Sequence, residues 1–246
     1  MQFRENTPID IDLDSLNLAY TTFIYGDDKD GNQVELAKIS CGANRIPVSI
    51  DRIPQHVRDA FVYIEDERFY EHAGVDWKRT FGAFLNELTH GMLYGSKQGG
   101  STITQQLVKN VTGDKEQNMD RKMREIFRAA DLEKYRTKDE ILDAYLNCVG
   151  MGGSCSGVQA AALKYFGKDV SELDLAEAAC LAAIPKSPES LNPFANKEAN
   201  RERQLLVLKA MYNNAAISKQ QYDDAVNEEL QFRDPNSCLL YTSDAA

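Results

Sequence analysis

The chain has 246 residues, 43% of them hydrophobic, which suits one large domain with a sizeable core and excludes global disorder. Its formal net charge of -10 makes it an acidic protein that we do not expect to bind nucleic acid through phosphates. No run approaches the roughly 20 apolar residues of a membrane-spanning helix, since the longest covers 178–184, and Met1 opens no signal-peptide pattern.

The first part of the chain, residues 1–52, predicts a linker that carries a short β-hairpin. Residues 20–25 are rich in strand formers, the pair Asp30-Gly31 is a turn signal, and residues 34–39 alternate between apolar and polar side chains. Prolines then separate this part from the rest of the chain.

The rest of the chain reads as helical, because apolar residues recur at helical spacing and capping boxes stand at several helix starts, at 137–140, 174–177 and 218–221. We predict helices at 57–71, 77–93, 101–110 with Ser101 as N-cap, 118–135, 137–147, 174–184 and from 218 onward. The expected fold is therefore mainly α, with one domain over 53–230. Residues 231–246 are expected to be a non-native or truncated tail, because the last ten resemble translated vector sequence.

The five cysteines contain no Cys-x-x-Cys pair, and the three histidines do not stand near them at metal-ligand spacing. A structural zinc site is therefore not expected. Cys148 precedes the Gly-rich loop at 150–157 and Cys155 lies near its end, so the two would either form a disulfide or stay as idle, buried thiols.

Glu65, Phe69 and His72 stand at positions i, i+4 and i+7 of the first predicted helix, so they would share one face. A carboxylate beside an aromatic ring and an imidazole can serve as a general base, and partial burial against Phe69 would favour proton uptake near working pH. The alternative is a charged, solvated helix end with Phe69 directed into the core. The spacing alone favours that alternative.

Residues 98–110 begin with glycines and continue with hydroxyl and amide side chains at a predicted helix start. Free backbone N–H groups and the positive end of the helix dipole at such a start suit a phosphate or pyrophosphate. Thr102, Gln106 and Lys109 follow at i, i+4 and i+7, near one face. The alternative is an ordinary loop and helix cap, although a buried helix would carry more apolar residues.

Four basic residues fall between positions 121 and 128, which stands out in an acidic chain. Arg121, Glu125 and Arg128 would share a helix face. The pattern indicates either a salt-bridged surface helix, which is its commoner meaning, or an anion clamp with a carboxylate inside it. Such a clamp would neutralise a departing pyrophosphate.

An apolar stripe rich in aromatic residues runs from Trp77 to Met92, with Lys78 and Arg79 at one end. Most such stripes belong to the core, whereas some lie on the surface of a bilayer. The pattern alone does not decide between the two.

Taken together and in this order, five blocks resemble the peptidoglycan glycosyltransferases, glycosyltransferase family 51. The blocks are EDERFYEHAG at 65–74, GGSTITQQ at 99–106, RKMRE at 121–125, KDEILDAYLN at 138–147 and RQLLVL at 203–208. The chain departs from the family pattern at Asp143, where Glu is usual, and at Gln204, where a second Arg is usual. We interpret the last block as structural.

The resemblance implies a mainly α-helical, lysozyme-like fold with a small membrane-associated jaw subdomain, in or beside which residues 77–94 would fall. It implies polymerisation of lipid II, in which a lipid-linked glycan chain is the donor and the 4-hydroxyl of the incoming sugar is the acceptor. A β-1,4 bond would form with inversion as undecaprenyl pyrophosphate leaves. The reaction would take place on the extracytoplasmic face of a bacterial cell membrane, with the cell-wall synthesis machinery as a further partner.

The resemblance also implies residue roles. Glu65 would be the general base on the acceptor hydroxyl, and Glu125 would be a second catalytic carboxylate that supports the donor site. Arg121, Lys122 and Lys109 would hold pyrophosphate charge. The substrate cleft would be shaped by Phe69, His72, Gly99, Thr102 and Gln106. Magnesium or another divalent cation would suit a pyrophosphate site, although no motif demands one.

Two other functions compete with this interpretation. A lysozyme-type hydrolase would use two carboxylates and water as the acceptor, but it would leave the basic residues unexplained. A non-catalytic cell-wall scaffold would need neither Glu65 nor Glu125. The transferase accounts for more of the residues than either.

Overall fold

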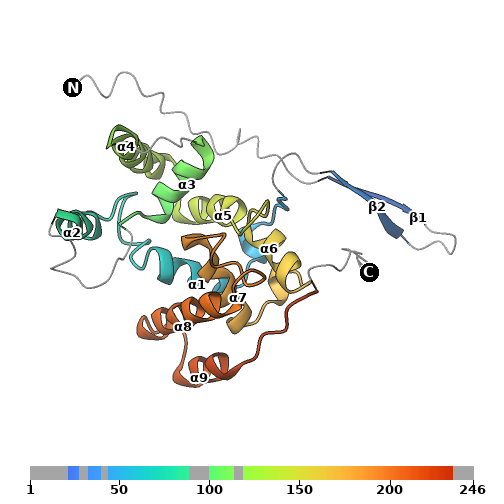
Figure 1. Cartoon of the computed structure of the whole chain (residues 1–246). Coiled ribbons are helices and arrows are strands. Elements are labelled where there is room, and N and C mark those ends of the chain that lie inside the picture. Colours follow the sequence, from blue (N-terminus) through green and yellow to red (C-terminus); the bar gives the residue numbers. More distant parts are fainter. Residues whose placement is uncertain (1–21, 28–32, 40–43, 89–99, 114–118, 235–246) are drawn as a thin grey trace.

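The computed structural model describes residues 22–27, 33–39, 44–88, 100–113 and 119–234 (Figure 1). Within these ranges the chain is mainly α-helical, as the sequence predicts. The helices are α1 (Gln55–Glu65), α2 (Trp77–Leu88), α3 (Ile103–Thr112), α4 (Met119–Tyr135), α5 (Lys138–Cys148), α6 (Val158–Tyr165), α7 (Leu175–Ala183), α8 (Lys197–Asn213) and α9 (Lys219–Asn227). Short 3-10 turns lie at η2 (Ile50–Arg52), η3 (Val170–Glu172) and η4 (Ile184–Lys186).

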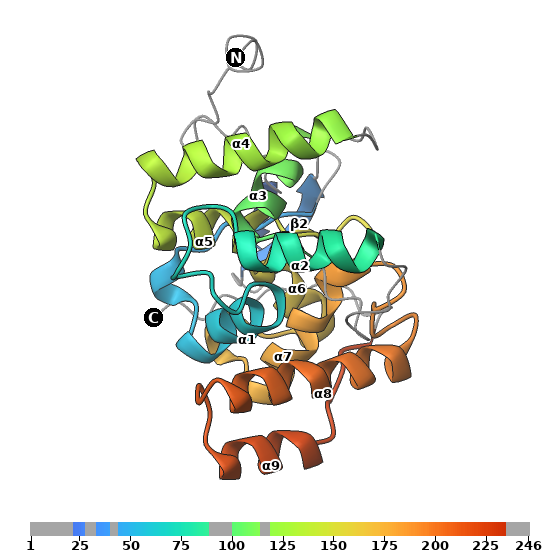
Figure 2. The ribbon, with the colours of Figure 1, turned by 90° about the vertical axis from the view of Figure 1, so that its left-hand side faces the viewer.

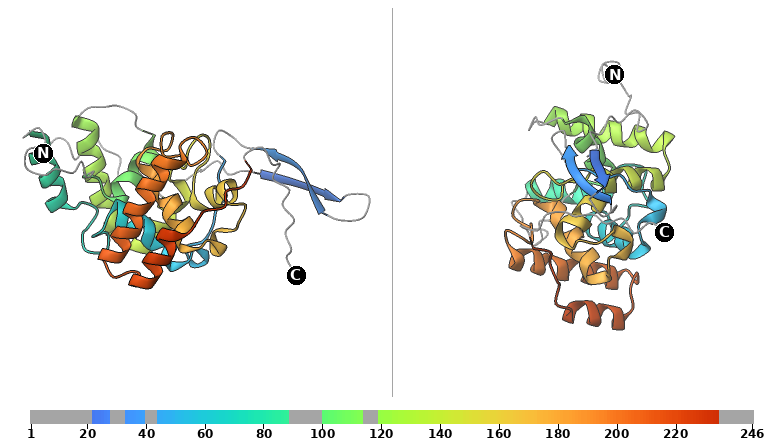
Figure 3. Two further views of the ribbon diagram at one scale, coloured as in Figure 1. Left: turned by 60° about the horizontal axis from the view of Figure 1, so that its bottom comes forward. Right: turned by 90° about the vertical axis from the view of Figure 1, so that its right-hand side faces the viewer.

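Two strands precede the helices. β1 (Thr22–Asp27) and β2 (Gln33–Ile39) pair antiparallel, and the pair projects from the helical body (Figures 1 and 3). The predicted turn at Asp30 and Gly31 lies outside the described residues.

The core is built around α7, whose residues are mostly alanine and are almost all buried. Small side chains let neighbouring helices approach closely, and α1 and α8 pack on α7. At the other end of the molecule α3 packs against α4 and α5 (Figure 2). The C-terminal end of α1 lies between these two groups of helices, so side chains there can reach both.

Local capping explains where several helices begin. The predicted capping boxes at 137–140, 174–177 and 218–221 are confirmed at the starts of α5, α7 and α9. The N-cap expected at Ser101 is wrong by one residue. Thr102 caps α3, because its hydroxyl accepts from the Gln105 N–H while the Gln105 side chain reaches back to the Thr102 N–H.

The beginning of the aromatic stripe is exposed. Trp77 and Phe81 in α2 are 65% and 62% exposed, so the core alternative is wrong for this part of the stripe. The side chains from 83 onward, through Met92, lie outside the described residues. A membrane-associated jaw at this position stays a prediction.

Cys148 and Cys155 both carry thiols, so of the two alternatives the structure shows the buried thiols and not the disulfide. Both cysteines are buried. Burial raises the pKa of the Cys148 thiol to about 12, so the thiol is protonated at neutral pH.

The segment before α1 is held on the domain by Asn147, a buried residue near the end of α5. Its side chain accepts from the Val48 N–H at 2.9 Å and donates to the Val48 carbonyl at 2.8 Å. One turn earlier, Asp143 accepts from the Ile50 N–H at 2.7 Å. These contacts fix the path by which the chain enters α1, and Asp143 still supplies a carboxylate where the family has Glu.

We predict that Asn147→Ala lowers the free energy of unfolding by about 2–4 kcal/mol, because it leaves both polar backbone groups of Val48 without partners. Chemical denaturation of the variant measures this. Asn227→Ala is the control, since that exposed side chain makes one local bond to the Asp223 carbonyl and its loss should cost under about 1 kcal/mol. Equal losses for the two variants would contradict the role of Asn147.

Candidate active site

The first helix stops at Glu65, so the predicted helix over 57–71 is wrong in its last turns. Asp66 leaves the helical path with φ -152° and ψ 71°, and turns follow. Glu65, Phe69 and His72 therefore do not share a helix face. The physical reason is the side chain of Asp66, which makes tertiary contacts that a continuing helix would not allow.

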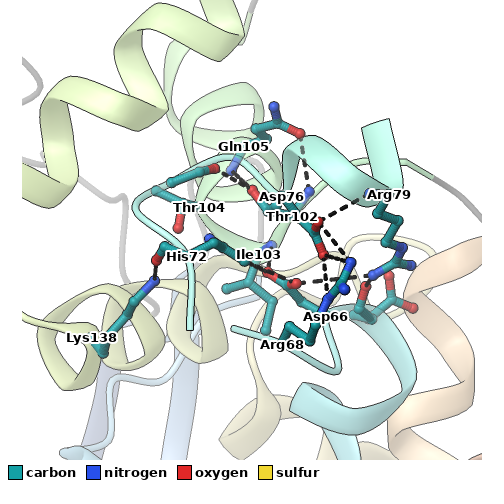
Figure 4. A network of polar contacts seen from close by, with 12 residues as sticks. Asp66, Arg68, His72, Asp76, Arg79, Thr102, Ile103, Thr104, Gln105 and Lys138 are labelled. Atoms are coloured by element: carbon teal, nitrogen blue, oxygen red, sulfur yellow. Dashed lines mark hydrogen bonds and ion pairs between the residues drawn. The ribbon is translucent and has the colours of Figure 1, made fainter. Parts of the chain in front are cut away.

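Asp66 has no exposed surface and lies at the start of α3 (Figure 4). Its carboxylate accepts from the backbone N–H of Ile103, the first residue of α3, at 2.9 Å. It also bonds His72 Nε2 at 3.0 Å and lies 3.9 Å from the guanidinium of Arg79. A negative charge at a helix N-terminus is stabilised by the helix dipole, so Asp66 joins the end of α1 firmly to the start of α3.

The loop between α1 and α2 is braced by a second carboxylate, Asp76, which is 5% exposed. Burial opposes its ionisation, but hydrogen bonds from the Arg79 N–H and the Arg68 guanidinium outweigh this and hold the pKa of Asp76 below its ordinary value of 3.8. Arg79 also donates to the backbone carbonyl of Glu65 at 2.7 Å. Arg79 therefore links Asp76 at the end of the loop to the backbone of Glu65 at the end of α1.

At the start of α3, side chains of the protein accept hydrogen bonds from three backbone N–H groups. The N–H groups of Thr102, Ile103 and Gln105 are bonded to Gln105, Asp66 and Thr102 side chains. The buried Thr102 hydroxyl also donates to the Gly74 carbonyl at 2.7 Å. These three N–H groups are therefore not free for a pyrophosphate, and Thr102 is the cap of α3. A pyrophosphate site elsewhere in the glycine-led start stays a prediction. Gly99 lies outside the described residues.

The Glu65 carboxylate sits where three helices meet and keeps some contact with solvent, at 11% side-chain exposure. Gln106 of α3 donates to its Oε2 at 2.9 Å, and Arg203 of α8 donates to its Oε1 at 3.2 Å. Gln106 is thus one of the residues predicted to shape the cleft, whereas the contact of Arg203 with Glu65 was not predicted. Arg203 also donates to the Ala183 carbonyl at 3.2 Å, so the interpretation of its block as structural stays open. A basic residue within a block shared with a glycosyltransferase family was the signal that could have indicated the contact.

Glu125 forms the second charged group. It is 5% exposed and accepts from Arg121 Nη1 at 3.0 Å and from Lys122 Nζ, one turn earlier on α4. Lys122 also donates to the Ser101 hydroxyl at 2.9 Å. Glu125 is therefore held between basic side chains of its own helix, which fits both the salt-bridged helix and the anion clamp. The contact between Lys122 and Ser101 places this charged group beside the residues that lead into α3.

The remaining candidates lie elsewhere. Phe69 is fully buried in the core, with the Lys138 ammonium 4.4 Å from its ring centre, which matches the alternative given above. His72 faces Asp66, and Lys138 donates to its carbonyl at 2.6 Å. Lys109 is exposed and lies about 10 Å further along the axis of α3 than Thr102. Among the described contacts, none joins Lys109 to the Glu125 group.

The described part of the chain contains no group of three or more His, Cys, Asp or Glu side chains close enough to hold a metal ion. Both oxygens of Glu125 accept from basic side chains. A divalent cation at this site stays a prediction.

Comparison with known proteins identifies a family that matches most of the chain. The family model described as Transglycosylase matches residues 32–212. Penicillin-binding protein 1A of Clostridium tetani is 39% identical over 241 residues, which cover 96% of this chain and 29% of the relative. Penicillin-binding protein 1A of Aquifex aeolicus is 44% identical over 192 residues, covering 78% and 26%.

Among solved structures, penicillin-binding protein 1A from Haemophilus influenzae matches with a TM-score of 0.51 and 25% identity, covering 87% of this chain and 21% of that chain. The chain thus spans under a third of the length of these relatives.

We predict that Asp66→Asn lowers the free energy of unfolding by about 2–4 kcal/mol, because the buried contacts with His72 and Arg79 lose their negative partner. Denaturant titration at neutral pH measures the change. Asp224→Asn, the same substitution at an exposed residue of α9, should change stability by under about 1 kcal/mol. If Asp66→Asn were as stable as this control, Asp66 would not be the anchor between α1 and α3.

Proposed function

The chain belongs to the transglycosylase family, and on that premise we propose that it polymerises lipid II into β-1,4-linked glycan strands for the bacterial cell wall. A lipid-linked glycan chain is the donor, and undecaprenyl pyrophosphate leaves. The observation that carries the proposal is that two acidic side chains, each bonded to donors, are tied to one short stretch, residues 101–106. Gln106 contacts Glu65, and Ser101 contacts the Lys122 that holds Glu125.

Glu65 acts as the general base on the 4-hydroxyl of the acceptor sugar. Each of its carboxylate oxygens accepts one hydrogen bond, from Gln106 or Arg203, and a carboxylate oxygen has room for a second. A sugar hydroxyl that approaches the exposed edge can therefore reach hydrogen-bond distance, which general-base catalysis requires. The two donors hold the carboxylate in place, and a carboxylate is the form that removes a proton.

Arg121 and Lys122 stabilise the charge that develops on the leaving pyrophosphate. Glu125 holds both cations in place before the substrate arrives, and preorganised cations stabilise a transition state without a cost of reorganisation. Lys109, exposed on α3, remains a third candidate for this charge. His72, Thr102 and Phe69 support the site from behind instead of lining the cleft as the family resemblance implies: His72 bonds Asp66, Thr102 caps α3 and Phe69 lies in the core.

A lipid-linked substrate requires the domain to work at a membrane surface, and we propose the extracytoplasmic face of the cell membrane, in contact with the cell-wall synthesis machinery. The exposed Trp77 and Phe81 on α2, next to Lys78, suit such a surface. No helix within the described ranges is long and apolar enough to cross a membrane. The catalytic domain is proposed to span residues 53–230.

We predict that Glu65→Gln lowers the rate of lipid II polymerisation by about 10²- to 10⁴-fold, because the amide cannot accept the proton of the acceptor hydroxyl. Gel analysis of glycan strands made from labelled lipid II measures the rate. Glu67→Gln, an exposed position two residues away, is the matched control and should polymerise normally. Near-normal polymer from Glu65→Gln would disprove the general-base role. Release of fragments from finished peptidoglycan, without polymer from lipid II, would indicate a hydrolase.

We predict that Lys122→Gln reduces kcat/KM for lipid II by about 10²-fold, because the leaving pyrophosphate loses one preorganised cation. Steady-state kinetics at fixed ionic strength measure the effect. Lys134→Gln removes the same charge from an exposed position of the same helix, where the lysine pairs with Asp131. Equal kinetics for the two variants would exclude Lys122 from the donor site.

A further inference from the structure

Tyr145 lies in α5 beneath the candidate active site and has no exposed surface. Burial raises its pKa well above the ordinary value, and the negative charge of Glu65 adds to this effect. The phenol is therefore a neutral hydrogen-bond donor at working pH. A hydroxyl in an apolar core costs free energy unless it is bonded, and a phenylalanine would fill the same space without that cost.

The Tyr145 hydroxyl donates to the side-chain carbonyl of Gln106, 3.4 Å away. The amide nitrogen of Gln106 donates in turn to Glu65 Oε2 at 2.9 Å. A carboxylate only accepts hydrogen bonds, so the amide nitrogen has to face Glu65 and the amide oxygen has to face Tyr145. The three side chains thus form one directional chain of hydrogen bonds, from the core to the surface of the site.

We infer that Tyr145 is a positioning residue, which acts through Gln106 to hold the Glu65 carboxylate toward the acceptor sugar. This inference rests on the proposed function, because the geometry of Glu65 affects turnover only if Glu65 is the base. Arg203 holds the other carboxylate oxygen at 3.2 Å. With both oxygens fixed, rotation of the carboxylate is restricted, and productive orientation is a recognised contribution to rate.

The test is Tyr145→Phe in the 246-residue chain, with lipid II as substrate. Loss of one orienting hydrogen bond should lower kcat about 3- to 10-fold. The KM for lipid II should stay within about twofold, because Tyr145 has no surface on which to contact substrate. A KM that rises while kcat is unchanged would overturn the inference.

Tyr165→Phe is the matched control. Tyr165 is also fully buried, and its hydroxyl donates to the Met151 carbonyl at 2.6 Å, outside the site. Both variants should show a lower melting temperature, but only Tyr145→Phe should show a lower kcat. Equal kcat values for the two variants would mean that the Tyr145 hydroxyl contributes only to stability.

A double-mutant cycle isolates the route through Gln106. In a Gln106→Met background, Tyr145→Phe should cause no further loss of kcat, because the amide that it orients is absent. Additive losses would overturn the inference. If wild type and Glu67→Gln polymerise, Glu65→Gln does not, and Tyr145→Phe matches wild type, the inference fails alone. A wild-type chain that makes no polymer from lipid II overturns the proposed function and the inference together.

Discussion

The geometry of the site depends on one buried contact, between the Asp66 carboxylate and the backbone N–H of Ile103. The contact places a full negative charge at the positive end of α3, where the charge and the helix dipole stabilise each other. Because the Asp66 side chain turns toward α3, α1 ends at Glu65. The Glu65 side chain then lies beside Gln106, which is in the first turn of α3, and it also contacts Arg203 of α8.

Buried hydrogen bonds explain the unusually polar start of α3. Thr102, Thr104 and Gln105 are fully buried, although a buried helix usually carries apolar side chains. Each makes a specific bond: Thr102 and Gln105 cap each other, and the Thr104 hydroxyl donates to Glu133 at 2.6 Å. The polar pattern that suggested a substrate-facing helix start therefore serves largely to fix this helix inside the protein. The proposed proton transfer and charge stabilisation therefore belong to side chains around α3, namely Glu65, Arg121 and Lys122, and not to the backbone at its start.

The features that the sequence predicts well are local ones. The cap boxes at Thr137, Asp174 and Ser218 need only residues three positions apart, and the group formed by Arg121, Lys122 and Glu125 lies within a single helix. Such patterns can be seen in a single sequence because their geometry follows from the helix alone.

The features that the sequence does not predict depend on contacts between distant segments. The end of α1 is decided by a residue 37 positions away, and Arg203 reaches Glu65 across 138 positions. No spacing rule links such residues. The prediction of a helix over 57–71 was wrong for this reason, and the contact between Arg203 and Glu65 could not be predicted from spacing, whereas the family resemblance, which depends on ordered blocks, correctly identified the family.

The most direct test of the proposed site is an experimental structure of the chain with unreactive lipid II analogues in both substrate positions. We predict that the acceptor 4-hydroxyl lies within hydrogen-bond distance of the Glu65 carboxylate and that the donor pyrophosphate contacts Arg121 and Lys122. A pyrophosphate bound instead to the backbone at the start of α3, with the acceptor hydroxyl away from Glu65, would contradict it.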